Sequence, residues 1–174
     1  MLILLAIFFS VPVHAAVTVT FYSREMGTRL PHAFITLHGT LDADGTPVDT
    51  SYGFTAIALS PAILFGSVPG EVRSLKPDYI AESDPHGSVV ISDEEYARLM
   101  AVVEKWRTKP GKSYNLNREN CVHFVAEIGR SIGMDAPDVP KLMKRPRSFI
   151  VGMIDRNQAW IAARTASPGM IAAH

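Results

Sequence analysis

Cysteine, excess charge of one sign and long apolar runs are all scarce in this chain of 174 residues. Cys121 is the only cysteine, which excludes an internal disulfide. The six histidines lack metal-ligand spacing, so the sequence predicts no metal site. Lysine and arginine number 17 and the acidic residues 17, so a net charge of zero gives no overall indication of a nucleic-acid partner. Neither Gly-rich type of phosphate-binding loop is present. These absences indicate neither a cofactor nor a nucleic acid.

The one sustained apolar run lies at the start of the chain, from Met1 to Val13. It is shorter than the roughly 20 residues that span a membrane, and small residues follow it around Ala15. We therefore predict a signal peptide over residues 1–15 and an exported protein, periplasmic or secreted. No Lys or Arg precedes the run, which leaves two alternatives open: an upstream start, or an uncleaved leader that would be the only membrane contact.

The rest of the chain has the composition of one globular domain, with 47% hydrophobic and 20% charged residues overall. Alternating β-branched patterns come first and amphipathic helical patterns come later, which predicts an α+β fold. The domain is expected over residues 16–165, followed by a flexible tail over 166–174. Strands are predicted at 17–22, 32–41, 48–57 and 89–91, and helices at 93–106, 121–132 and 148–160. Residues 60–88 are rich in Pro and Gly and predict a long irregular connection with one or two short strands.

Cys121 is expected in the first turn of a helix. Asn120 is a favoured N-cap, apolar residues follow at helical spacing, and Gly133 ends the pattern. Unpaired N–H groups and the helix dipole at such a position favour a thiolate, so the pattern predicts a cysteine nucleophile with a lowered pKa. The alternatives are a small buried residue, or a thiol that pairs with another chain.

A thiol nucleophile needs a base, most often histidine. His123 is on the same helix but about 200° around its axis from Cys121, so it is not expected to face the thiol. His32 and His38 share one face of a predicted strand, and His32 stands at the strand start, where a side chain can border a cleft. His32 is therefore the first candidate base and His38 the second.

The string Asn-Cys-Val-His-Phe-Val at 120–125 resembles the Asn-Cys-Glu-His-Phe-Val signature of the lecithin:retinol acyltransferase-like proteins. These are a branch of the circularly permuted NlpC/P60 papain-like group, in which the base histidine comes early on a strand and the cysteine late at a helix start. His32 and Cys121 have this order. The resemblance implies a permuted papain-like fold, with an antiparallel sheet packed against the cysteine-bearing helix, over roughly Val17 to Met134.

Two departures from the family pattern concern the site. The signature glutamate is Val122 here, and the third polar residue that orients the histidine has no clear counterpart. A hairpin through Asp44-Gly45 would bring the next strand beside His32, and we take Tyr52 on it as the candidate partner. Asn120 is the candidate for a second donor, beside the backbone N–H of Cys121, to a reaction oxyanion.

The resemblance implies a thiol hydrolase in which a Cys121–His32 pair acts on an amide or ester acyl group. Export favours an amide of a cell-wall peptide (peptidoglycan), as in the NlpC/P60 branch, whereas the signature itself favours a lipid ester and a thiol acyltransferase or lipid hydrolase. The basic segment from Lys141 to Arg147 would suit an anionic wall polymer or phospholipid headgroups. A non-catalytic binding or partner protein on the same scaffold is the alternative from another class. Apolar surroundings of His32 would favour it.

Overall fold

The computed structural model describes residues 16–25, 30–58, 60–109, 111 and 113–166. The predicted leader lies outside this range, as does nearly all of the predicted tail. The strands are β1 Val17–Arg24, β2 His32–Thr40, β3 Pro47–Ala56, β4 Gly70–Arg73 and β5 Asp84–Ile91. The helices are the 3-10 helix η1 Pro61–Leu64 and the α-helices α1 Pro77–Ala81, α2 Asp93–Arg107, α3 Cys121–Ser131, α4 Pro146–Arg156 and α5 Gln158–Ala166. The α+β class is confirmed.

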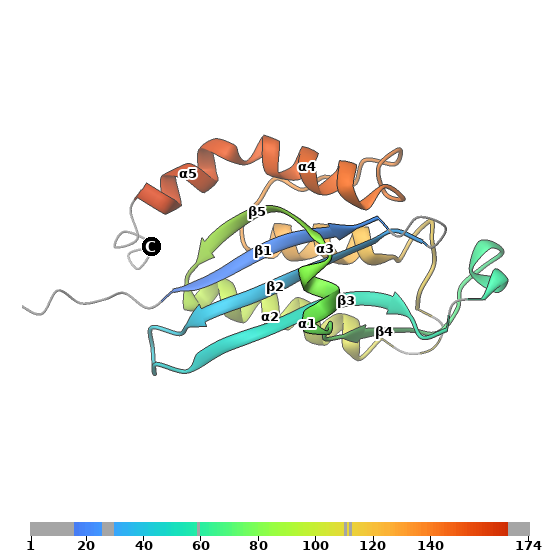
Figure 1. The fold of residues 1–174 in the computed structure, drawn as a ribbon, viewed down its shortest axis with the longest axis horizontal. Helices are drawn as coiled ribbons and strands as arrows, with labels where there is room; N and C mark the ends of the chain where they lie inside the picture. The colour runs from blue at the N-terminus through green and yellow to red at the C-terminus, as the bar shows by residue number, and fades with distance from the viewer. Residues whose placement is uncertain (1–15, 26–29, 59, 110, 112, 167–174) are drawn as a thin grey trace, which may run out of the picture.

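The five strands form one antiparallel sheet in the order β4-β3-β2-β1-β5 (Figure 1). The predicted hairpin joins β2 and β3 through Asp44 and Gly45. Gly45 has a φ of 73°, which is left-handed backbone that favours glycine. The region 60–88 contains the short strands predicted there, namely β4 and the first part of β5, and two short helices that were not predicted, η1 and α1. Pro85 and Gly87 hide that part of β5 in the sequence, because neither residue is typical of strands.

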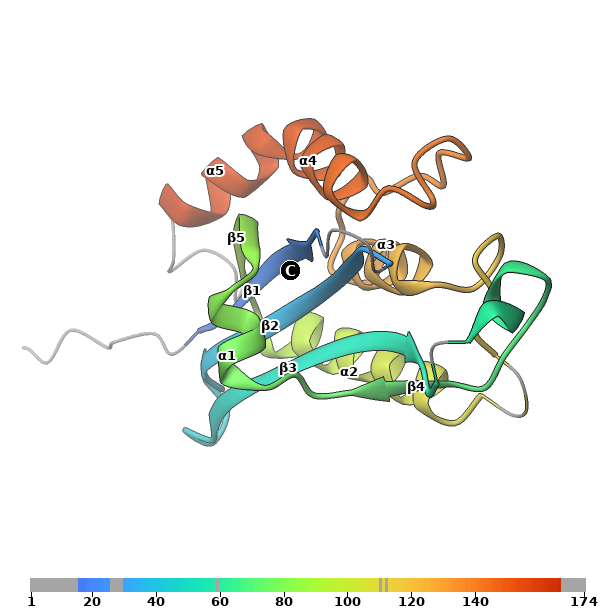
Figure 2. The ribbon, with the colours of Figure 1, turned by 45° about the vertical axis from the view of Figure 1, so that its right-hand side comes forward.

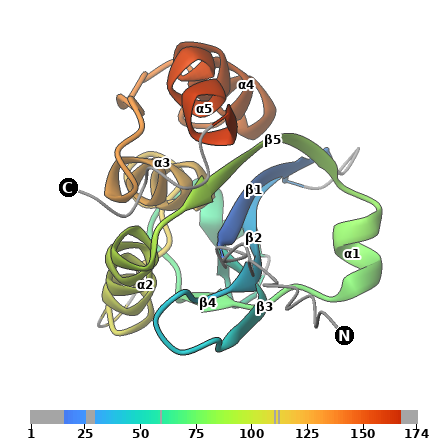
Figure 3. The same ribbon diagram turned by 90° about the vertical axis from the view of Figure 1, so that its left-hand side faces the viewer.

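The two faces of the sheet have different covers. Helices α2, α3 and α4 pack on one face, and α1 lies alone over the other (Figures 2 and 3). Along β2, the side chains of Ala33, Ile35 and Leu37 are fully buried in the core beneath the helices. Phe34, between them, points to the α1 face and stacks there on Tyr22 of β1, with ring centroids 5.1 Å apart.

The helical segments follow their sequence signals closely. Ser92 and Glu95 form the predicted capping box of α2, with each side chain accepting a backbone N–H of the other residue. The single helix predicted at 148–160 is wrong, because the chain turns between α4 and α5 at Asn157. The Asn157 side chain is buried and bonds both backbone groups of Asp135, at 2.9 Å each. Among the described residues, no helix has the length and apolar character needed to cross a membrane.

Candidate functional site

Cys121 is the first residue of α3, as predicted, and Asn120 caps the helix. The Asn120 Oδ1 accepts the N–H of Val122 at 2.8 Å and that of His123 at 3.2 Å. Its Nδ2 donates to the carbonyls of Leu116 and Met143, at 2.8 and 2.7 Å. Both donor hydrogens of this amide are therefore engaged, so Asn120 holds the site together and does not offer a hydrogen to an oxyanion.

The thiol of Cys121 is surrounded by hydrogen-bond donors. The backbone N–H groups of Ala33, Val122 and Cys121 itself, and the hydroxyl of Tyr114, each favour the thiolate and so act to lower the pKa of the thiol. Burial has the larger, opposite effect, because the residue is only 3% exposed. The net result raises the pKa of Cys121 to about 11. The expected lowering of this pKa is wrong for this arrangement, and the thiol is protonated at neutral pH.

A cavity of about 90 Å³ lies over Cys121. Its walls come from the chain before β2, the loop before α3 and the loop before α4, and include Leu30, Pro31, Tyr114, Leu116, Met143 and Lys144. This volume is well below the roughly 300 Å³ at which pockets enclose a whole small ligand. The cavity therefore suits the end of a larger substrate, such as one acyl group, and not a complete small molecule.

His32 is the first residue of β2, but its ring lies on the α1 face. Gly53 leaves the space for it, since a Cβ at that position would come within 2.7 Å of the His32 Nε2. The ring centroid lies 6.1 Å from that of Phe34 and 6.4 Å from that of Tyr79 on α1. Burial, and secondarily the positive charge of Arg73, lower the pKa of His32 to about 4. No described residue hydrogen-bonds to the ring.

Cys121 and His32 therefore both lie at the start of β2, but their side chains do not contact each other. The thiol lies against the backbone of Ala33, the residue that follows His32, on the helix face. The imidazole lies on the opposite face, beside Gly53. With pKa values of about 11 and about 4, both groups are neutral at pH 7 and form no ion pair.

Tyr52 does not accompany His32. It is paired with Ile35 in the register of β2 and β3, which places it on the helix face. There the guanidinium of Arg107 lies 5.8 Å from the centre of its ring. The placement does not fit the expected orienting role, because the side-chain alternation along β3 puts Gly53, and not Tyr52, on the face of His32.

The other described histidines have their own positions. The second candidate base, His38, is largely exposed, with its Nδ1 3.7 Å from an oxygen of Asp49. The Nε2 of His86 lies 2.7 Å from the hydroxyl of Ser23. His123 completes the cap of α3, with Nδ1 2.9 Å from the Asn120 Oδ1. None of these three lines the cavity over Cys121.

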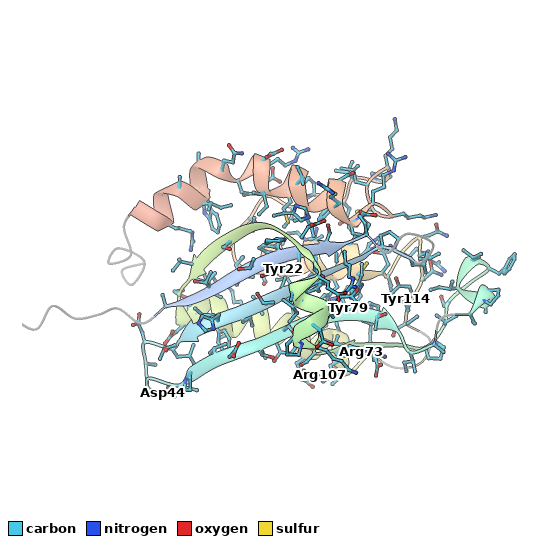
Figure 4. The ribbon with its side chains drawn as sticks, viewed as in Figure 1. Tyr22, Asp44, Arg73, Tyr79, Arg107 and Tyr114 are labelled. Atoms are coloured by element: carbon cyan, nitrogen blue, oxygen red, sulfur yellow. The ribbon has the colours of Figure 1, made fainter. Side chains whose placement is uncertain are left out.

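Two tyrosines are the side chains that the sequence reasoning missed. Tyr114 is 5% exposed, is held by backbone bonds to Val68, and bonds the thiol. Burial and the neighbouring Cys121 raise its pKa, so it remains a hydrogen-bond donor. Tyr79, labelled with Tyr114 in Figure 4, contacts His32 from α1. The guanidinium of Arg24 lies 4.2 Å from the Tyr79 ring centre. Both residues lie in segments whose direction depends on tertiary contacts, and no local pattern marks them.

Comparison of the chain with models of protein families, with curated proteins and with solved structures finds no match. Among the described residues, no group of three or more His, Cys, Asp or Glu side chains could hold a metal ion. The arguments about function therefore depend on the geometry around Cys121 and on the sequence resemblance.

Proposed function

We propose that this protein is an exported cysteine hydrolase that acts on an amide or ester acyl group, on a permuted papain-like scaffold of the NlpC/P60 kind. The observation that carries the proposal is the setting of the Cys121 sulfur. It lies at the start of α3, at the wall of a cavity, among the donors from Ala33, Val122, Cys121 and Tyr114. A cysteine with a purely structural role typically packs among apolar groups, whereas this sulfur borders a cavity and has groups beside it that favour the thiolate.

In the proposed reaction, His32 acts as the base and must turn its ring around the start of β2 to reach the thiol. The arrangement described above is then the resting one. His32 takes the proton of Cys121, and the sulfur attacks the acyl carbon to form a tetrahedral adduct. The backbone N–H of Cys121 and the Tyr114 hydroxyl, in place of Asn120, donate to the oxyanion. His32 returns the proton to the departing amine or alcohol, and water releases the acyl group from the thioester.

The favoured substrate is an amide of a cell-wall peptide, because the predicted signal peptide would bring the protein to the compartment that holds such peptides. An ester of a lipid is the alternative on the same scaffold, with either water or an acceptor alcohol or amine completing the transfer. The cavity accommodates the acyl end in both cases.

A non-catalytic binding or partner protein is the second candidate, and a specific observation favours it. The ring of His32 is surrounded by Phe34, Tyr79 and Gly53, without a hydrogen-bonding partner among the described residues. A histidine that only packs in an aromatic cluster would have these neighbours.

The labelling rate of Cys121 by iodoacetamide, measured against pH, distinguishes the two candidates. The variants are His32→Ala and, as the matched control, His38→Ala, which changes an exposed histidine of the same strand. We expect slow labelling in the parent, a rate at pH 7 at least tenfold lower in His32→Ala, and no change in His38→Ala. Mass spectrometry after mixing with a p-nitrophenyl ester should show an acyl adduct on Cys121. Equal rates in all three proteins and no adduct would support the binding-protein reading.

A further inference from the structure

The connection between β3 and β4 carries the most exposed large apolar side chains of the described chain. Phe65 is 89% exposed, Leu64 66% and Ile57 55%. They belong to η1 and its flanks, which project beyond the end of the sheet (Figures 1 and 2). We call Ile57, Leu64 and Phe65 the apolar tip. Clustered exposed apolar side chains on a projecting loop mark an interaction site more often than isolated ones do.

The apolar tip is fixed to the wall of the Cys121 cavity. Val68, three residues beyond Phe65, makes two backbone bonds with Tyr114, of 2.9 and 3.0 Å. The Asn115 side chain donates to the Ser67 hydroxyl at 3.0 Å. Because Tyr114 lines the cavity, the tip and the cavity belong to one structural unit at this end of the sheet.

Positively charged side chains without an ion-pair partner among the described residues lie beside the cavity. Lys141, Lys144 and Arg145 precede α4 and are exposed, and no carboxylate of the described residues lies within ion-pair distance of them. Elsewhere the cations are commonly paired, as Lys105 is with Glu127 and Arg130 with Asp138. Lys144 itself lines the cavity, and Lys141 and Arg145 lie within three residues of it along the chain.

We propose that this end of the molecule docks on the surface of an anionic phospholipid bilayer. The side chains of Leu64 and Phe65 would enter the acyl boundary, while Lys141, Lys144 and Arg145 contact the phosphates. Attraction to an anionic membrane requires a local group of cations, because the net charge of the whole chain is zero. A purely anionic polymer would use the cations but leave the apolar tip in water, which favours the bilayer. This docking does not depend on catalysis by Cys121, and it is separate from the membrane contact that an uncleaved leader would make.

The test uses Phe65→Trp in the full chain, because quenching of the introduced indole by brominated acyl chains reports insertion of the tip itself, whatever the leader does. With phosphatidylglycerol vesicles we expect strong quenching, and little with phosphatidylcholine. The parent, with Trp106 and Trp160 alone, is the baseline. Adding Lys141→Gln and Arg145→Gln should raise the lipid concentration for half-maximal quenching by about 25-fold, since each cation contributes roughly fivefold.

The matched control removes two exposed cations elsewhere, by Lys76→Gln and Arg156→Gln, and should leave that concentration within about twofold of the Phe65→Trp value. Absence of quenching with phosphatidylglycerol would overturn the proposal. Equal quenching in both lipids, or equal effects of the two charge variants, would overturn its electrostatic basis. Fluorescence of the Phe65→Trp protein that changes with protein concentration in the absence of vesicles would instead assign the tip to contact with a second copy.

Discussion

The partly buried imidazole of His32 should make the protein lose stability in acid. Its pKa is 6.5 in an unfolded chain and about 4 in the folded one, so between these values the unfolded state binds the extra proton. Stability is therefore complete above pH 6.5 and falls as the pH drops toward 4. A tenfold change in an equilibrium is worth about 1.4 kcal/mol, so this one group should account for about 3 kcal/mol of the loss between pH 7 and pH 4.

The assay is urea unfolding at a series of pH values for the parent, His32→Phe and His38→Gln. Carboxylates also titrate in this range, so the quantity of interest is the difference between proteins. His32→Phe keeps an aromatic ring in the cluster with Phe34 and Tyr79, and should be less sensitive to acid than the parent by about 3 kcal/mol. His38→Gln, a change at an exposed side chain, should retain the acid loss of the parent. If His32→Phe and the parent lost stability in parallel, the lowered pKa of His32 would be refuted.

Three further substitutions test other parts of the structure. Gly53→Ala should displace the ring of His32, because the new Cβ would lie 2.7 Å from the His32 Nε2. NMR titration should then show a His32 pKa closer to 6.5, whereas unchanged ring signals would contradict the geometry. Glu95→Gln removes the charge of a buried carboxylate that accepts hydrogen bonds from both terminal nitrogens of Arg164, at 2.8 and 2.7 Å. It should lower the free energy of unfolding, measured in urea, by about 3 kcal/mol, against less than about 1 kcal/mol for Glu94→Gln at an exposed position. Asn157→Ala removes the bonds that hold the turn between α4 and α5 and should cost about 2 kcal/mol by the same assay; a cost below about 0.5 would show that packing alone sets the turn.

Much of the fold could be predicted because local signals and tertiary structure agree. The capping box at Ser92 and the cap at Asn120 each fix a helix start through bonds within four residues, and the structure has both. The break at Asn157 could not be predicted, because it depends on bonds to Asp135, 22 residues away in sequence. In the 60–88 region the sequence predicted short strands but not where they lie, because β4 and the start of β5 are defined by their partners and not by their composition.

The site was predictable only in part. The position of Cys121 follows from the helix cap, which is local. The pKa of the thiol does not follow, since it depends on how deeply the first turn of α3 is buried, and burial outweighs the local N–H donors. Tyr114 reaches the sulfur through its pairing with Val68, a contact between loops that has no sequence signature.

The direction of the His32 side chain depends on one step of strand alternation. Ala33 faces α3 and His32 therefore faces α1, so the residue whose backbone contacts the thiol is the neighbour of the candidate base and not the base itself. Gly53 then determines where the ring rests, since it is the absence of a Cβ there that gives the imidazole its space. If Gly53→Ala both frees His32 from the α1 face and speeds the labelling of Cys121 by iodoacetamide, the ring can reach the thiol, and this result would support a catalytic role. If the ring moves and the labelling rate stays the same, the two residues act separately and the scaffold serves binding.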